Sequence, residues 1–378
     1  MNLAIQSNGF RAAVKAMLAL ALLSCTPTAP SGGSCARADL AFAGDVLLHQ
    51  LIQQDAAGRP EGFAPAFAPI TAALSRADVT VVNLEGPAAR NIGLGNREIA
   101  DPGTLYDNRA YTGFPRFNYH PSIAGVLRNA GVDVVQTANN HALDRGAIGV
   151  DLTLQALVEA GLPSTGTHAR GTEATWHVTR QVSGRTVAFV ACTYSTNGLT
   201  NGRSQVLGCY ENTPSVPNLI QTLADTPGID AVILLPHWGT EYSARPNARQ
   251  RRLAQAAADA GATAIVGAHP HVLQPMETLT ARDGRQVPVA YSLGNLISSQ
   301  WSLPNRTGAI LYLDLARDEA GRTVATNLRY LPTRVERFAQ GGVAVSPAAL
   351  LPNGPASVAH ARQVLGPRAV GLDGCLAD

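Results

Sequence analysis

The residues of this sequence best suited to chemistry are histidines, carboxylates and amides that each follow a short apolar run. His237 follows the run 231–235, and His269 and His271 follow the run 263–266 with one proline between them. The remaining members follow other apolar runs in the same way: Asp45, Glu85, Asn140, His141 and Asn295. Imidazole mixed with carboxylate and amide, without thiolate, suits Zn, Mn, Fe or Ni better than Ca or a cysteine-based zinc site. The pattern therefore indicates a divalent metal site.

The runs that precede these residues are short, rich in Val and Ile, and bounded by turn residues, which is typical of buried strands. They cover 40–44, 79–84, 132–135, 231–235, 263–266 and 289–293. Helical patterns occupy the stretches between them, at about 65–77, 121–130, 149–160, 216–224 and 247–260. Strands that alternate with helices predict an α/β fold, and such folds bind ligands outside the carboxyl ends of the strands. We therefore expect the polar residues at the strand ends to meet.

The pattern changes after residue 308. Residues 309–315 and 323–330, with a turn between them, predict an antiparallel hairpin. Because no repeat or long linker divides residues 39–337, we expect one domain there. Residues 338–378 contain Gly and Pro throughout and are expected to be an irregular C-terminal tail.

Six short motifs, in order along residues 39–298, resemble those of the CapA family. They are Gly44-Asp45, Asn83-Leu84-Glu85, 138–146 (ANNHALDRG), 237–242 (HWGTEY), 267–272 (GAHPHV) and 291–295 (YSLGN). That family is associated with poly-γ-glutamate capsule synthesis and is related to calcineurin-like metallophosphoesterases. The resemblance implies a four-layer α/β/β/α metallophosphoesterase-like sandwich, whose second sheet would include the 308–330 hairpin.

The resemblance also implies a role for each residue of the site. Asp45 and His271 would bind a first metal, Glu85 would bridge, and a second metal would be held by Asn140, His237 and His269. His141 matches the family's catalytic histidine, which contacts phosphate and can protonate a leaving oxygen. Paired metals about 3.5–4 Å apart can clamp a phosphate group and lower the pKa of a bound water.

The first motif departs from the hydrolase pattern. Metallophosphoesterases normally have Asp-x-His on the first strand, whereas Asp45 is followed by Val46 and Leu47, and the next histidine is His49. If His49 does not reach the metal, the first site lacks a ligand, and the centre holds a single ion or is weakly occupied. Whether the chain is an enzyme is therefore left open by the sequence.

Three further residues near the motifs have open roles. Asp144 could orient an active-site histidine, or bond its own turn, and the turn is slightly favoured. Glu241 could line a substrate pocket or lie in an exposed loop. Asn295 follows a strand and is a candidate substrate contact.

The composition excludes several classes of protein. Lys15 is the only lysine and lies in a segment expected to be removed, so a Schiff-base lysine and a phosphate-binding-loop lysine are both absent from the mature chain. The formal net charge of +2 comes entirely from residues 1–24. A neutral chain without a basic run gives no electrostatic support for nucleic-acid binding.

The N-terminal residues indicate export. Basic residues followed by a short apolar stretch are typical of a signal peptide, expected at 1–24, and Leu22-Leu23-Ser24-Cys25 resembles a lipobox in which Cys25 carries lipid. Residues 25–38 would form a flexible tether. The alternative is an ordinary signal cut after Ala38, which would give a secreted or periplasmic soluble protein instead of a membrane-anchored lipoprotein.

Four cysteines remain once Cys25 is assigned to lipid: Cys35, Cys192, Cys209 and Cys375. In an oxidising compartment they are expected to form two disulfides, with three connectivities open. We expect Cys192–Cys209 across one loop and Cys35–Cys375 near the chain ends.

Two functions follow as hypotheses. The first is a metal-dependent hydrolase of phosphoester-like bonds in the cell envelope, linked to capsule or poly-γ-glutamate synthesis. The second is a non-catalytic component for export or anchoring of a capsule polymer, with a binding-only site. The expected partners are an envelope polymer or small anionic substrate, other capsule synthesis or export proteins, and the membrane through a lipid anchor.

Overall fold

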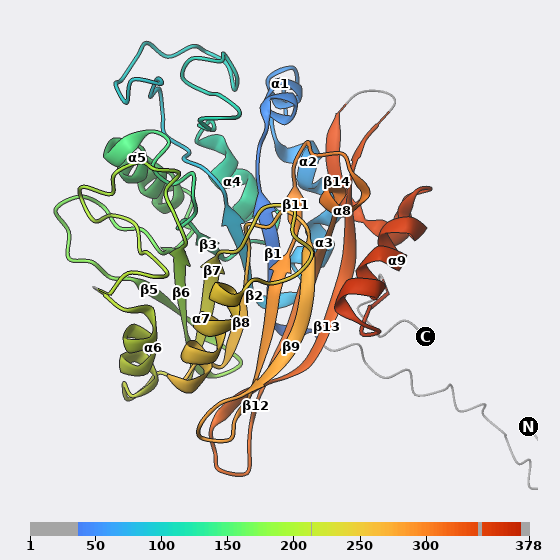
Figure 1. Ribbon diagram of the computed structural model, residues 1–378. Coiled ribbons are helices and arrows are strands. Elements are labelled where there is room, and N and C mark those ends of the chain that lie inside the picture. Colours follow the sequence, from blue (N-terminus) through green and yellow to red (C-terminus); the bar gives the residue numbers. More distant parts are fainter. Residues whose placement is uncertain (1–36, 213, 339–341, 372–378) are drawn as a thin grey trace, which may run out of the picture. The chain divides into compact units, whose positions relative to one another are not determined.

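The computed structural model describes residues 37–212, 214–338 and 342–371. Their strands form two sheets (Figure 1). The eight-stranded sheet has the order β14-β13-β12-β1-β2-β3-β4, with β11 paired to β1. Its strands are β1 (Ala38–Val46), β2 (Ala77–Leu84), β3 (Val134–Gln136), β4 (Ser164–Thr165), β11 (Asn295–Ile297), β12 (Thr307–Arg317), β13 (Thr323–Arg337) and β14 (Val343–Pro347).

The six-stranded sheet has the order β5-β6-β7-β8-β10-β9. Its central strands β6, β7, β8 and β10 are parallel, and β5 and β9 pair antiparallel at the two edges. The strands are β5 (His177–Val182), β6 (Arg185–Thr193), β7 (Ala231–His237), β8 (Ala264–Val266), β9 (Leu273–Thr280) and β10 (Gln286–Leu293).

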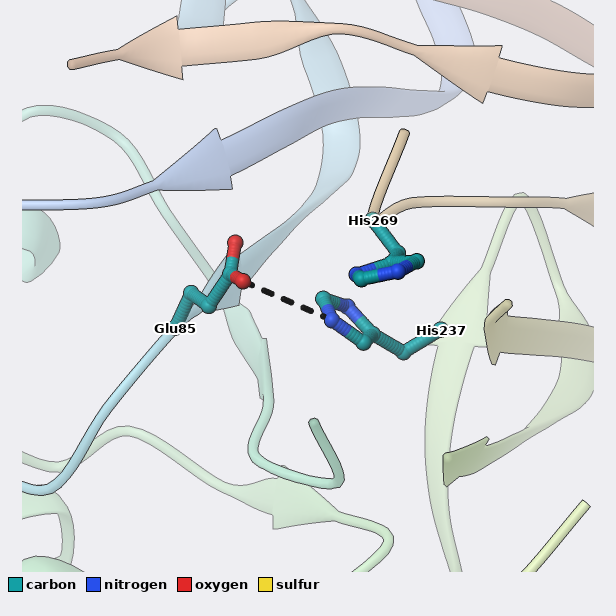
Figure 2. Close-up of side chains that lie close together, drawn as sticks. All are labelled: Glu85, His237 and His269. Atoms are coloured by element: carbon teal, nitrogen blue, oxygen red, sulfur yellow. Dashed lines mark ion pairs between the residues drawn. The ribbon is translucent and has the colours of Figure 1, made fainter. Parts of the chain in front are cut away.

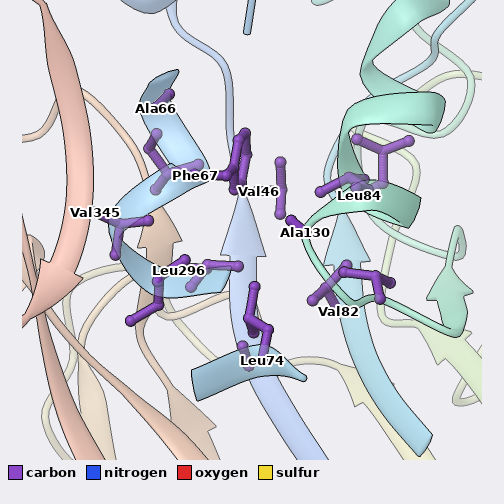
Figure 3. Close-up of a cluster of buried hydrophobic side chains, with 14 of the residues drawn as sticks. Val46, Ala66, Phe67, Leu74, Val82, Leu84, Ala130, Leu296 and Val345 are labelled. Atoms are coloured by element: carbon purple, nitrogen blue, oxygen red, sulfur yellow. The ribbon is translucent and has the colours of Figure 1, made fainter. Parts of the chain in front are cut away.

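Three hydrophobic clusters define the layers. Between the sheets, side chains of β1 and β2 pack with side chains of β6 and β7, as Phe42 and Phe189 illustrate. On the outer face of the eight-stranded sheet, Phe67 and Leu74 pack against Val46 and Val82 (Figure 3). On the outer face of the six-stranded sheet, helices α6 (Val216–Ala224) and α7 (Ala248–Asp259) contribute buried side chains. The result is the expected four-layer α/β/β/α sandwich.

The remaining helices are α1 (Gln50–Ala57), α2 (Ala64–Phe67), η1 (Ala68–Ile70), α3 (Thr71–Leu74), α4 (Ser122–Asn129), α5 (Gly146–Glu159), α8 (Leu303–Arg306), η2 (Ala348–Leu350) and α9 (Gly354–Leu365). Of these, α4 and α5 lie close to the predicted stretches 121–130 and 149–160, whereas α1, α8, η2 and α9 have no predicted counterpart. The single helix expected at 65–77 is wrong. It is split into α2, η1 and α3, because Pro69 has no N–H to donate and interrupts the α-helical hydrogen bonds.

The predicted hairpin exists as β12 and β13, but its expected place in the second sheet is wrong. Strand β12 pairs antiparallel with β1, with Leu40 opposite Leu313, so the hairpin extends the sheet that contains Asp45. The strands that carry or precede the sequence motifs are divided between the two sheets. Strands β1 and β2 lie in the eight-stranded sheet, and β7, β8 and β10 lie in the six-stranded sheet.

The expectation that residues 338–378 are irregular is also wrong for the part that the structure describes. Strand β14 continues the eight-stranded sheet beside β13, and the side chain of Val345 is buried. Helix α9 places Ala361 and Leu365 against the cluster between the sheets. An added Cβ on Gly354 would lie 1.6 Å from the carbonyl oxygen of Ala348, so the start of this helix requires glycine.

The described residues contain one of the two expected disulfides, between Cys192 at the end of β6 and Cys209. Cys25, Cys35 and Cys375 lie outside the described residues. Searched over the same residues, the structure holds no helix with the length and apolarity needed to cross a membrane.

Removal of this disulfide gives a first prediction. The bond closes a loop with a sequence separation of 17, and a loop of this size restricts the unfolded chain by roughly 3 kcal/mol. We expect the double variant Cys192→Ala/Cys209→Ala to unfold at a lower urea concentration than the parent when both are measured without reductant. The parent measured with reductant should shift in the same direction, and equal midpoints for all samples would contradict the prediction.

Candidate metal centre

The two sheets bring their carboxyl ends to the same place. Asp45 is near the end of β1, and Glu85 directly follows β2 in the eight-stranded sheet. His237 is the last residue of β7, and His269 and His271 follow β8 in the six-stranded sheet. All five side chains are buried. The site therefore depends on both sheets, and neither sheet could form it alone.

These residues converge as two overlapping sets. In each set the potential ligand atoms lie within 4.8 Å of one another. One set is Glu85, His237 and His269, whose side chains point toward one another in Figure 2, and the other is Asp45, Glu85 and His271. Glu85 belongs to both sets, which is the geometry required of a ligand between two ions.

The donors fit a divalent cation. Both carboxylate oxygens of Glu85 and Nδ1 of His269 are buried, and none forms a hydrogen bond with any described residue. Glu85 Oε1 lies 3.5 Å from His237 Nε2 and 3.7 Å from His271 Nε2, which are ion-pair distances. An unsatisfied buried polar group costs about 1–3 kcal/mol, and a charged one costs more. One or two divalent ions would satisfy these atoms together.

The pKa shifts reflect the same concentration of charge. Burial opposes ionisation of Glu85, but His271 and His237 outweigh it and hold the pKa of this carboxyl well below its ordinary value. Burial lowers the pKa of His271, but Glu85 and Asp45 together raise it to about 9. Burial and then the charge of His237 hold the pKa of His269 well below its ordinary value. The buried carboxylates thus require positive charge nearby.

Asn140 faces the same point as His237. Its Oδ1 lies 2.8 Å from His237 Nε2, and its Nδ2 donates to Asn197 Oδ1 at 3.3 Å. An amide oxygen beside an imidazole nitrogen and the Glu85 carboxylate matches the donor set implied for the second metal.

Two asparagines that the sequence analysis included only within motifs hold the ligands in place. Asn83 Nδ2 donates to Asp45 Oδ1 at 2.8 Å and lies 3.2 Å from His237 Nδ1, so one amide touches a ligand from each sheet. Asn139 Nδ2 donates to the carbonyl of Leu84 at 2.7 Å, and its Oδ1 accepts from the backbone N–H of His141 at 3.1 Å. The sequence signal that could have identified these two asparagines was their position next to other site residues at strand ends.

His141 is held by Asp144. Its Nδ1 lies 2.7 Å from Asp144 Oδ2, which also accepts from the backbone N–H of Phe117 at 2.7 Å. The ring of Phe117 packs edge-on against His141 with centroids 4.7 Å apart. The interpretation that Asp144 bonds its own turn is therefore wrong. The carboxylate of Asp144 orients the ring of His141, and the backbone N–H of Phe117 in turn holds this carboxylate in place.

The backbone at the two neighbouring histidines is strained. His269 has φ 99° and His271 has φ 57°, in the region that side chains other than glycine rarely adopt. Such a residue costs about 1–3 kcal/mol and persists only where its surroundings hold it. Asp45 Oδ2 accepts from the backbone N–H of His269 at 3.3 Å and lies 3.1 Å from His271 Nδ1. Strain of this kind is concentrated at functional sites.

His49, Asn295 and Glu241 lie next to the centre. His49 belongs to neither set; it packs edge-on against Phe117 at 5.5 Å, and burial followed by the charge of His271 lowers its pKa to about 4. Asn295 is buried, its Oδ1 lies 3.1 Å from His271 Nδ1, and its Nδ2 donates to three acceptors. Asn295 therefore helps to hold the ring of His271 through its side-chain oxygen. Glu241 is exposed and approaches His269 and His271.

The fold and the site together define an α/β/β/α sandwich with a histidine–carboxylate–amide cluster where the strands of both sheets end. Residues 39–300 match the family described as bacterial capsule synthesis protein PGA_cap, and the chain belongs to this family.

Two curated relatives are about one-third identical to this chain over the part that aligns. The PGA biosynthesis protein CapA of Bacillus subtilis (strain 168) is 34% identical over 208 residues, which cover 53% of this chain and 52% of that protein. The capsule biosynthesis protein CapA of Bacillus anthracis is 33% identical over 190 residues, which cover 49% and 45%. The chain thus spans about half the length of the curated relatives it matches.

Two solved structures show limited likeness. A hypothetical protein from Thermus thermophilus has a TM-score of 0.44 and 18% identity, with 78% of this chain and 98% of that chain covered. The NAD nucleotidase NadN of Haemophilus influenzae has a TM-score of 0.41 and 14% identity, with 79% and 50% covered. Likeness of this size adds nothing to the fold and the family membership given above.

The centre gives a second prediction. We expect His237→Ala to bind Mn²⁺ or Zn²⁺ more weakly than the parent, because it removes a direct ligand. Loss of a residue that only supports a ligand lowers metal affinity by roughly 10–100-fold, and we expect His237→Ala to exceed that loss. Calorimetric titration measures the affinity, and His177→Ala in β5 serves as the control. Parent-like metal binding by His237→Ala would contradict the site.

Proposed function

We propose that this protein acts in the synthesis of a capsule polymer in the cell envelope, as a metal-dependent hydrolase of a phosphoester-like bond. The capsule role is supported by family membership and by the names of the two curated relatives. The hydrolytic role is supported by the ligand sets that share Glu85 beside an oriented histidine.

The chemistry follows from how the side chains are held. Bound divalent ions would clamp a phosphoryl group and lower the pKa of a water molecule. Glu85, His237, His269 and Asn140 would hold one ion, and Asp45, Glu85 and His271 the other. His141, whose Nδ1 is bound to Asp144, has its other ring nitrogen free of that bond to contact the substrate and deliver a proton to the leaving oxygen.

The contact between His141 and Asp144 carries the proposal. A histidine that only filled space beside a metal would need no buried carboxylate to fix its ring. Asp144 is buried, and its side chain accepts from both His141 and the backbone of Phe117. A positioned acid next to a metal cluster is the arrangement that hydrolysis of a phosphoester requires.

One observation favours the second candidate, a binding-only site in polymer export or anchoring. Leu47 occupies the position at which the hydrolase pattern has a metal-binding histidine, and its side chain is buried in the core beneath the helices. In this candidate the centre binds an anionic group of the polymer and no bond is cleaved.

The third prediction separates the two candidates. With saturating Mn²⁺ and diphenyl phosphate, whose weakly acidic phenol is a leaving group that requires a proton, the parent should release phenol, and His141→Ala should lose roughly 10²–10⁴-fold in turnover while it keeps its metal. Asp144→Asn should also lose activity, because a neutral amide holds the ring of His141 less strongly than the carboxylate does and stabilises its protonated form less. His168→Ala, outside the centre, is the control. If the metal-loaded parent cleaves neither this probe nor isolated envelope polymer, the hydrolase proposal is wrong and the binding-only candidate remains.

The fourth prediction concerns location. We propose that Cys25 anchors the protein to the membrane through lipid. Cys25→Ala should move the protein from the membrane fraction to the soluble fraction, with the loss of the mass of the lipid in an intact-protein spectrum. Cys35→Ala is the matched control and should stay in the membrane fraction. A Cys25→Ala protein that remains at the membrane with its mass otherwise unchanged would contradict the lipoprotein proposal.

A further inference from the structure

Glu241 forms a third cluster at the metal centre. One carboxylate oxygen of Glu241 and one ring nitrogen each of His269 and His271 lie within 4.8 Å of one another. The two histidines are buried, whereas Glu241 is exposed. Glu241 therefore approaches the centre from the solvent side, and Glu85, which is fully buried, approaches from within.

The turn that carries Glu241 is fixed at the next residue, Tyr242. Tyr242 has φ 62°, its backbone N–H donates to the carbonyl of Pro270 at 2.8 Å, and its hydroxyl accepts from Gln300 at 3.1 Å. Pro270 is the residue between the two histidines, so this bond ties the turn directly to the ligand loop. Such anchoring is more than an exposed loop residue needs.

Two tyrosines, Tyr194 and Tyr242, pack beside the histidines of this cluster. The ring of Tyr194 lies 4.4 Å from that of His269, and the ring of Tyr242 lies 6.1 Å from that of His271. The Glu241 carboxylate lies at the same rim, because one of its oxygens is within 4.8 Å of a ring nitrogen of each histidine.

The centre lacks a donor that Glu241 can provide. Leu47 is buried in the core and cannot coordinate, and His49 belongs to none of the three clusters. His269 Nδ1 is buried and has no hydrogen-bond partner among the described residues. We infer that Glu241 is a metal ligand on the solvent side of the centre, in place of the histidine that the first strand lacks.

This inference rests on the metal centre of the proposed function and has two consequences. A further carboxylate adds a hard oxygen donor, which shifts the preference of the site toward Mn²⁺ and away from softer ions. Because its side chain is exposed, Glu241 is also the ligand that an incoming anion would displace. An anionic substrate would then exchange with Glu241 while Asp45 and Glu85 stay bound.

The test is metal binding to the full chain, by Mn²⁺ calorimetry and by the visible spectrum of the Co²⁺-loaded protein. We expect Glu241→Ala to lower Mn²⁺ affinity at least tenfold and to change the Co²⁺ spectrum, since the number of ligands falls. Glu241→Asp should restore part of the affinity. Glu241→Gln guards against misfolding of the alanine variant and should fall between the parent and alanine.

The control is Glu319→Ala. Glu319 is exposed in the turn between β12 and β13, at the end of the sheet away from Asp45, as the pairing of Leu313 with Leu40 shows. It should bind Mn²⁺ as the parent does. If Glu241→Ala and Glu241→Gln keep parent affinity and the parent Co²⁺ spectrum, Glu241 is not a ligand and this inference alone fails. If the parent binds neither ion, the proposed metal centre fails as well.

Discussion

The structure of the site depends on the buried carboxylate of Glu85. A charged group removed from water is strongly unfavourable unless opposite charge and hydrogen-bond donors surround it. The carboxylate of Glu85 accepts no hydrogen bond from any described residue and faces His237 and His271 at ion-pair distances. A cation between these side chains meets that need, and Glu85 is the one member common to both buried ligand sets.

The rest of the site brings donors from two sheets to that carboxylate. Within each sheet, parallel strands place their carboxyl ends on the same side. The carboxyl ends of the two sheets meet only because the sheets pack face to face over a shared apolar cluster. Asn83 contacts Asp45 from one sheet and His237 from the other. The strained backbone of His269 and His271 is stabilised by Asp45, which contacts both residues. Stability of the sandwich and geometry of the centre are therefore linked.

Loops complete the site around this rigid base. The Cys192–Cys209 disulfide closes the loop that carries Tyr194 to His269 and Asn197 to Asn140. Another loop carries Phe117 to His141 and is bonded to Asp144 through its backbone. Loops can change in sequence without loss of the core, whereas the ligands on strand ends cannot move without it.

The sequence by itself determined the α/β class, the strands that end at the site, and the buried polar residues that converge there. Short Val- and Ile-rich runs specify strands through local periodicity, and residues such as His237 and Glu85 are placed at the strand ends by their position in the chain. Only the tertiary structure decided that β12 pairs with β1, that β14 and α9 are regular, that Asp144 binds His141, and that Glu241 approaches His269. Each of these depends on a contact between segments or side chains whose meeting is set by packing. Local periodicity carries no information about which strand becomes the neighbour or which side chain faces the open side of the site.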